Sequence, residues 1–159
     1  MIMVLGIGNA MKGDDGVGPL VAARLAAVGK ASHPSPDRRP AAAITALDCG
    51  TTPENYTSVV RRLRPELLVL VDAAQMGLKP GECRIIPAER VGALGLSTHS
   101  MPLSMFMSYV SDLVSRIVLV GVQPAAMVLG DGLCEEVAAA ADRLVEILVR
   151  GGIDSVPRL

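Results

Sequence analysis

The chain has 159 residues, of which 50% are apolar and 19% are charged, so it can bury a core and is too apolar to be disordered. Its formal net charge is -1, and it contains one Phe, two Tyr and no Trp, so we expect no nucleic-acid partner. The length predicts one domain over residues 1–159.

Cysteine usage and hydropathy predict the compartment. Cys49, Cys83 and Cys134 are far apart in the sequence and form no Cys-x-x-Cys pair, which favours a reducing cytoplasm. No apolar run reaches the roughly 18 uncharged residues that a membrane span needs, and the N-terminus lacks the positive stretch of a signal peptide. We therefore expect a cytoplasmic protein with no membrane insertion.

Apolar runs predict the strands. Several of the runs are apolar without alternation, which is typical of strands that are covered on both faces. In chain order, the five predicted strands are Ile2–Ile7, Ala43–Leu47, Leu67–Val71, Cys83–Ile86 and Ile117–Val122.

Helical patterns alternate with these strands. The second pattern has the capping-box spacing of Thr51 and Glu54, followed by apolar residues at helical spacing. The alternation predicts an α/β fold, a three-layer sandwich in which helices cover both faces of a five-stranded, mostly parallel sheet. The four helices are expected from Pro19 to the residue before Gly29, after Thr51, from Pro102, and up to Gly151.

A glycine-rich turn over residues 6–18 joins the first strand to the first helix, where nucleotide-binding turns occur. The dinucleotide fingerprint fails, because Met11 stands where its third glycine is needed. The P-loop spacing is matched, but Asp14 and Asp15 replace Lys and Ser/Thr, and carboxylates repel a phosphate. A metal cation suits this loop better. A helix cap is the simpler interpretation of Asp14.

Two further residues are expected beside Asp15. Asp72 follows the apolar run Leu67–Val71, and a charge that ends a buried strand must be paired, solvated or bound. Both aspartates should lie at the carboxyl edge of the sheet, where ligands bind in open α/β folds. His33 lies in a proline-rich loop, whereas His99 precedes the third helix, whose N-terminus should point to the same edge. Two carboxylates and one imidazole can hold a borderline divalent metal, although capping roles are the alternative for each.

Seven segments, from Gly6–Asn9 to Gly121–Pro124, together resemble the hydrogenase maturation endopeptidases. Among these, they resemble the group that processes the large subunit of hydrogenase 3-type nickel–iron hydrogenases. The proline-rich loop around residues 30–40 looks longer than in this family, and the tail after Gly151 is short. The matching segments cover nearly the whole chain up to the fourth helix: Gly6–Asn9, Gly13–Gly18, Asp48–Asn55, Leu63–Asp72, Met76–Glu82, Thr98–Leu103 and Gly121–Pro124.

The resemblance implies a twisted α/β sandwich and an endopeptidase that cuts a C-terminal extension from the large-subunit precursor after nickel insertion. It places the family's metal contacts, and with them catalysis, on Asp15, Asp72 and His99. Nickel would come with the precursor, and zinc or cadmium could replace it in vitro. Either the metal polarises a carbonyl or a water, or it serves recognition only and Asp15 or Asp72 acts as general base. A non-proteolytic nickel chaperone and a nucleotide-binding module are the alternatives.

Overall fold

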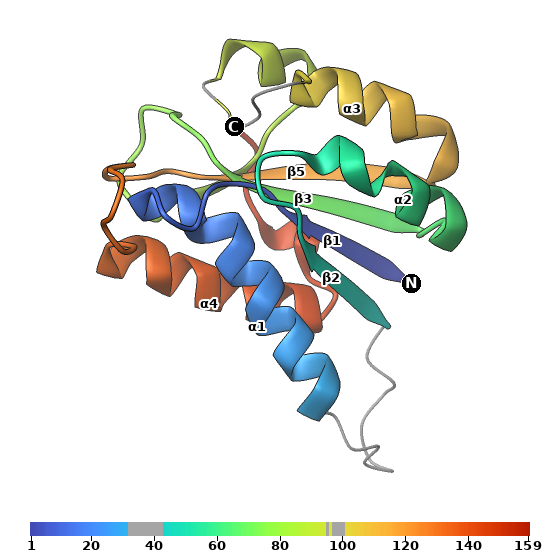
Figure 1. Ribbon diagram of the computed structural model, residues 1–159, viewed down its shortest axis with the longest axis horizontal. Coiled ribbons are helices and arrows are strands. Elements are labelled where there is room, and N and C mark those ends of the chain that lie inside the picture. The colour runs from blue at the N-terminus through green and yellow to red at the C-terminus, as the bar shows by residue number, and fades with distance from the viewer. Residues whose placement is uncertain (32–42, 95, 97–100) are drawn as a thin grey trace.

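A five-stranded sheet in the order β2-β1-β3-β5-β4 forms the centre of the molecule (Figure 1). The structure is a computed structural model that describes residues 1–31, 43–94, 96 and 101–159. The predicted mostly parallel sheet is confirmed, with β4 antiparallel to β5 at one edge. The strands are β1 (Ile2–Gly6), β2 (Ile44–Asp48), β3 (Leu67–Ala73), β4 (Cys83–Ile85) and β5 (Arg116–Val122).

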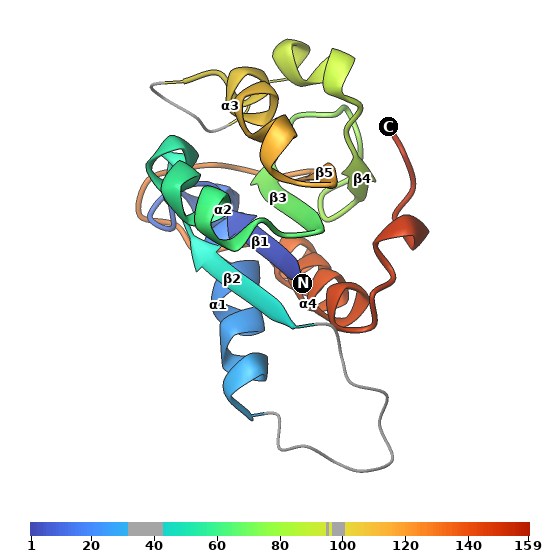
Figure 2. The same cartoon turned by 90° about the vertical axis from the view of Figure 1, so that its right-hand side faces the viewer.

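Helices cover both faces of the sheet, as predicted (Figure 2). One face carries α1 (Val17–Ala31) and α4 (Glu135–Val149), and the other carries α2 (Thr57–Leu63) and α3 (Leu103–Val110). Short 3-10 helices complete the described part of the chain: η1 (Gly13–Gly16), η2 (Pro53–Tyr56), η3 (Ala88–Ala93), η4 (Ser111–Leu113) and η5 (Ile153–Ser155).

The central strands send alternate side chains into two hydrophobic clusters. Val69 and Val71 of β3 belong to the cluster that includes residues of α1 and α4. Leu68 and Leu70 belong to the cluster that includes residues of α2 and α3. Both faces of the strand are therefore buried, which explains why its sequence is continuously apolar.

The order of the strands creates a switch point between β1 and β3. From β1 the chain passes through α1 to β2 on one side, and then crosses to β3 on the other side of β1. β1 and β3 are parallel and pair in register, so their carboxyl ends adjoin where the strand order reverses. Ligands of open α/β sheets bind at such points.

The predicted limits of α1 were wrong at both ends. The helix begins at Val17, two residues before Pro19, and continues through Gly29 to Ala31. Proline is tolerated in the first turn of a helix, because its missing N–H has no helical acceptor there. An exposed glycine inside a helix costs only about 1 kcal/mol relative to alanine, so Gly29 weakens the helix without ending it.

The capping box predicted for the second helix was also wrong. The chain first forms η2, which begins at Pro53, and α2 follows only from Thr57. Neither segment has a side-chain cap at its N-terminus, so Thr51 does not act as the predicted cap. The helix ends at Arg64 in the left-handed conformation, with φ of 42°, and Pro65 prevents its continuation.

The starts and ends of the last two helices agree better with the sequence. α3 follows Pro102 as expected, and it is followed directly by η4. α4 ends just before Gly151, which has φ of 70° and donates its N–H to the carbonyl of Leu148 at 3.0 Å. This is the glycine-terminated helix end that the sequence predicts. Among the described residues, no helix combines the length and the apolar character needed to cross a membrane.

Gly18 tests how closely α1 packs on the sheet. A Cβ at Gly18 would lie 2.3 Å from the carbonyl oxygen of Ile7 and 2.4 Å from that of Val71. Because both neighbours are backbone atoms of the sheet edge, Gly18→Ala should lower the free energy of unfolding by at least about 2 kcal/mol. The midpoint of urea unfolding measures this loss.

Gly29→Ala is the matched control on the same helix, because a Cβ there meets no atom within 4 Å. It should raise the free energy of unfolding by about 0.5 to 1 kcal/mol. Equal unfolding midpoints for the two variants would contradict this packing of α1.

Candidate functional site

The loop between β1 and α1 carries Asp15 to the switch point. The side chain of Asp15 is only 5% exposed, and its Oδ2 accepts a hydrogen bond from the N–H of Asn9 at 2.8 Å. Gly8 has φ of 136°, and a Cβ there would lie 1.9 Å from the carbonyl oxygen of Asp15. Only glycine therefore lets the loop close on itself and hold the carboxylate in this orientation.

The adjacent Asp14 is buried as well, but it binds a different loop. Its Oδ2 accepts hydrogen bonds from the N–H groups of Ala125 at 2.7 Å and Ala126 at 3.1 Å. Its Oδ1 accepts from the N–H of Cys134 at 2.8 Å, and Cys134 is the N-cap of α4. The capping role of Asp14 is thus found at a different helix from the one expected, because it serves α4 and not α1.

Two opposed effects act on the pKa of Asp14. Burial disfavours the charged carboxylate and by itself would raise the pKa. The backbone N–H groups of Cys134, Ala126 and Ala125 favour the charged form. The hydrogen bonds prevail together, so the pKa of Asp14 lies below the usual aspartate value.

Asp72 lies inside β3 and not after it, because the strand continues to Ala73. Its side chain is fully buried, and it is in register with Gly121 of β5. By the alternation of the strand, it shares the face of Leu70, which is covered by α2 and α3. The segment η1, which contains Asp15, contacts β3. The two aspartates therefore lie at the carboxyl edges of neighbouring strands, as predicted.

His99 falls outside the described residues, so its place in the site stays a prediction. The following helix, α3, begins near the carboxyl edge of the sheet and runs back toward the start of β5 (Figure 1). This is the direction that the prediction requires. Over residues 1–31, 43–94, 96 and 101–159, no three His, Cys, Asp or Glu side chains are grouped as a metal site. A metal site with Asp15 and Asp72 thus needs a further ligand.

Gln123 fixes the loop that follows Asp72, a role that the sequence did not predict. The side chain is 5% exposed, and its Oε1 accepts hydrogen bonds from the N–H groups of Met76 at 2.7 Å and Leu78 at 3.3 Å. Its Nε2 donates to Gln75 Oε1 at 3.0 Å. The only signal in the sequence was an amide residue at the end of a buried strand, directly before a proline.

The loop after β2 forms a third wall of this edge. Gly8 donates its N–H to the carbonyl of Gly50 at 2.8 Å, and Asp48 Oδ1 accepts from the N–H of Gly50 at 2.9 Å. Cys49 lies between Asp48 and Gly50 and is buried. Its burial, together with the charge of Asp48, raises the pKa of its thiol to about 12. A thiol with this pKa stays protonated and is a poor nucleophile at neutral pH, so Cys49 is not a candidate nucleophile.

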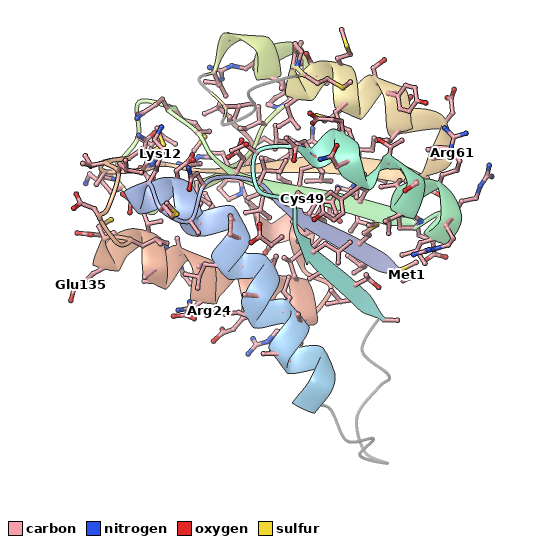
Figure 3. All side chains as sticks on the ribbon, viewed as in Figure 1. Met1, Lys12, Arg24, Cys49, Arg61 and Glu135 are labelled. Atoms are coloured by element: carbon pink, nitrogen blue, oxygen red, sulfur yellow. The ribbon has the colours of Figure 1, made fainter. Side chains whose placement is uncertain are left out.

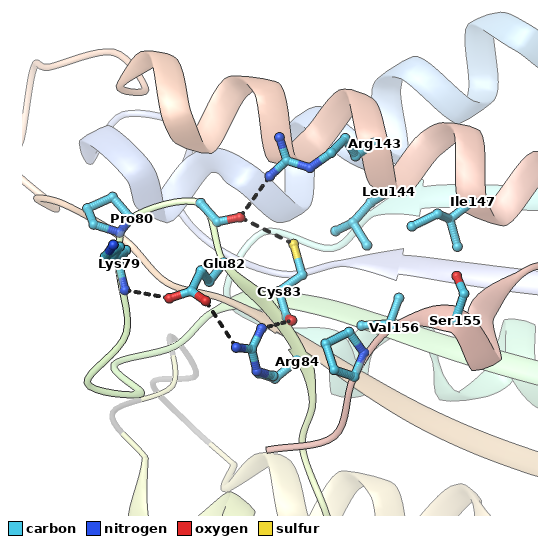
Figure 4. A pocket seen from close by; sticks show the side chains of 12 residues that line it. Lys79, Pro80, Glu82, Cys83, Arg84, Arg143, Leu144, Ile147, Ser155 and Val156 are labelled. Carbon is cyan, nitrogen blue, oxygen red and sulfur yellow. Dashed lines mark hydrogen bonds and ion pairs between the residues drawn. The ribbon is translucent and has the colours of Figure 1, made fainter.

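A groove of about 480 Å³ lies apart from the aspartates, between β4, α4 and the C-terminal segment (Figure 4). Its charged side chains mostly bind neighbouring groups of the groove: Arg84 pairs with Glu82 at 3.0 Å, and Arg143 donates to the carbonyl of Gly81 at 3.0 Å. Neither Asp15 nor Asp72 lines it. The groove is therefore not the candidate catalytic site.

Comparisons with known proteins show the family to which the chain belongs. The family model HycI, hydrogenase maturation protease, matches residues 32–151. The hydrogenase 3 maturation protease of Escherichia coli K12 is 37% identical over 123 residues, which are 77% of this chain and 72% of that protein. The chain belongs to the hydrogenase maturation protease family.

Solved structures of hydrogenase maturation proteases have the same fold. The endopeptidase HycI from Escherichia coli superimposes with a TM-score of 0.82 at 29% identity, covering 100% of this chain and 96% of that one. The NiFe hydrogenase maturation protease HycI from Thermococcus kodakarensis gives a TM-score of 0.75 at 35% identity, covering 96% and 92%. The chain is therefore a hydrogenase maturation endopeptidase, and the peptidase prediction is confirmed over the chaperone and nucleotide-binding alternatives.

Asp14→Ala tests whether Asp14 holds the two loops together. The variant leaves three backbone N–H groups without their acceptor, so the free energy of unfolding should fall by about 3 kcal/mol near neutral pH. Because the pKa of Asp14 is lowered in the folded state, its stabilisation is complete above the ordinary aspartate pKa of about 3.9. It is lost as the pH falls through the lowered value, so the difference from the wild type should shrink below about pH 4.

Asp131→Ala is the control, because it removes an exposed carboxylate from the loop that Asp14 binds. Its unfolding midpoint should stay close to that of the wild type. Urea unfolding at several pH values measures both variants, and an Asp14→Ala effect that is constant down to pH 2 would contradict this role.

Proposed function

We propose that this endopeptidase removes the C-terminal extension from the large-subunit precursor of a nickel–iron hydrogenase, after nickel has entered the precursor. Asp15, Asp72 and His99 contact the nickel of the precursor, which is part of the substrate. The observation that carries the proposal is the pair of carboxylates buried at the switch point, 5% and 0% exposed, in a chain of this family.

The burial of both aspartates supports contact with a cation. Moving a carboxylate out of water costs several kcal/mol unless opposite charge or hydrogen bonds compensate it. The loop orients Asp15 through the N–H of Asn9, which fixes one oxygen of the carboxylate. Carboxylate oxygens and an imidazole nitrogen suit a borderline divalent metal, and such a set leaves coordination positions for the precursor's own ligands.

The imidazole is assigned to His99, because the direction of α3 suits that residue. The helix begins four residues after His99, at the end of the molecule where the parallel strands finish. The other histidine, His33, belongs to the proline-rich segment that follows α1. Nickel in the precursor is the natural occupant, and zinc or cadmium could replace it in vitro.

Two routes to peptide hydrolysis use the same three residues. In the first route, the three side chains hold the nickel of the precursor in position, and the nickel polarises the scissile carbonyl or a water molecule. In the second, the metal only marks the mature precursor, and Asp15 or Asp72 takes a proton from the attacking water as general base. In both routes the side chains must reach the nickel, so the substitutions below test the assignment common to both.

His99→Ala should lower the rate of cleavage of the nickel-loaded precursor at least about 100-fold, because it removes the imidazole contact. Asp15→Asn and Asp72→Asn should have effects of similar size, since a neutral amide is a poor ligand and no base. The loss of mass from the C-terminus of the precursor measures the rate.

His33→Ala is the matched control for the histidine, and Asp112→Asn, which changes an exposed carboxylate of η4, is the control for the aspartates. Both controls should cleave at the wild-type rate. If His99→Ala cleaved the nickel-loaded precursor as fast as His33→Ala, the assignment of the three residues would be wrong.

A further inference from the structure

Two loops beside the candidate site expose large apolar side chains. Met11 of the β1–α1 loop is 67% exposed, and Val128 and Leu129 of the β5–α4 loop are 52% and 68% exposed. We call these three residues the apolar tip. Val128 and Leu129 are adjacent in the sequence, and the pairing of the two loops brings Met11 near them. Exposed apolar side chains that gather on one part of a surface commonly mark a site of interaction.

Backbone pairing holds the apolar tip in place. Lys12 and Leu129 form an antiparallel bridge, and Gly130 donates its N–H to the carbonyl of Met11 at 2.8 Å. Gly13 has φ of 56°, and a Cβ there would lie 2.8 Å from the carbonyl oxygen of Ala126. The two loops therefore approach as closely as their backbones allow, and the tip is preformed.

The apolar tip is joined directly to the candidate site. Asp14 binds the N–H groups of Ala125 and Ala126, which begin the loop that carries Val128 and Leu129. Asp15 directly follows Asp14 in the chain. Figure 3 shows Lys12 beside the loop that leads from β5 to α4, at the end of the molecule where the parallel strands finish.

We propose that the apolar tip docks an apolar segment of the precursor polypeptide that flanks its nickel centre. This inference rests on the proposed function, and it assigns to Met11, Val128 and Leu129 the selection of the polypeptide, as distinct from contact with the metal. A preformed apolar surface binds such a segment at a small cost in conformational entropy.

Charge and area both favour this occupant. In the two loops, the charged side chains besides the buried Asp14 and Asp15 are Lys12 and Asp131, whose charges are opposite, so the surface suits a neutral segment. A stable protein dimer needs about 800 Å² and 20 to 30 residues on each side, which three side chains do not supply. A segment already tethered to a bound metal centre needs much less contact.

The test combines Met11→Ser, Val128→Ser and Leu129→Ser in one variant, which is assayed with the nickel-loaded precursor. All three side chains are exposed, so the unfolding midpoint should stay close to that of the wild type. We expect KM to rise at least about tenfold, with kcat within about twofold of wild type. The reason is that the contact stabilises the bound substrate and the transition state equally, so its loss weakens binding without slowing the chemical step. Leu129→Met keeps the apolar surface and should keep the wild-type KM.

Val28→Ser is the control for loss of an exposed apolar side chain. Val28 is 38% exposed and lies on α1, about 16 Å along the helix from its first residue. Its KM should equal that of the wild type, and a rise in KM confined to the tip variant supports the proposal.

Three results would overturn the docking proposal: an unchanged KM in the tip variant, a fall in kcat with unchanged KM, or a wild-type dimer that the tip substitutions dissociate. Each of these results leaves the metal contacts of Asp15, Asp72 and His99 standing if the wild type cleaves the nickel-loaded precursor. Failure of the proposed function shows differently, as a His99→Ala variant that cleaves normally.

Discussion

The buried carboxylate of Asp14 holds together the two loops on which the site depends. Its hydrogen bonds join the β1–α1 loop to the segment between Ala125 and Cys134, more than 100 residues away in the sequence. Without this link, the loop that carries Asp15 would lose its hydrogen bonds to the β5–α4 loop through Asp14. The N–H of Cys134, the N-cap residue of α4, would also lose its acceptor. The position of Asp15 therefore depends on a contact of its neighbour.

In the proposed site, Asp14 and Asp15 have two different tasks, which a single carboxylate could not combine. The hydrogen bonds to Asp14 lower its pKa and use both of its oxygens in the structure itself. Asp15 accepts a hydrogen bond from the N–H of Asn9 within its own loop, which follows β1 at the edge where β1 and β3 end. A structural anion beside a functional one lets the loop be stable and still present a charged group to a partner.

The sheet could be predicted from the sequence because its strands are continuously apolar, and Leu67–Val71 needed only two further residues to match β3. The ends of α1 could not be predicted, because a helix tolerates both Pro19 and Gly29. Pro19 lies in the first turn, where its missing N–H costs no hydrogen bond, and Gly29 keeps its N–H. The edge position of Asp15 and Asp72 could be predicted, because each residue was expected directly beyond the carboxyl end of a predicted parallel strand. The partners of Asp14 and the anchoring role of Gln123 could not be predicted, because both depend on contacts between segments that are distant in the sequence.

We propose that this endopeptidase recognises nickel in its substrate through the carboxylates buried at the switch point. Cleavage of nickel-loaded and nickel-free precursor, compared side by side with the wild-type chain, tests it most directly. We expect loss of the C-terminal extension from the nickel-loaded precursor and an intact nickel-free precursor. Equal cleavage of the two would contradict it.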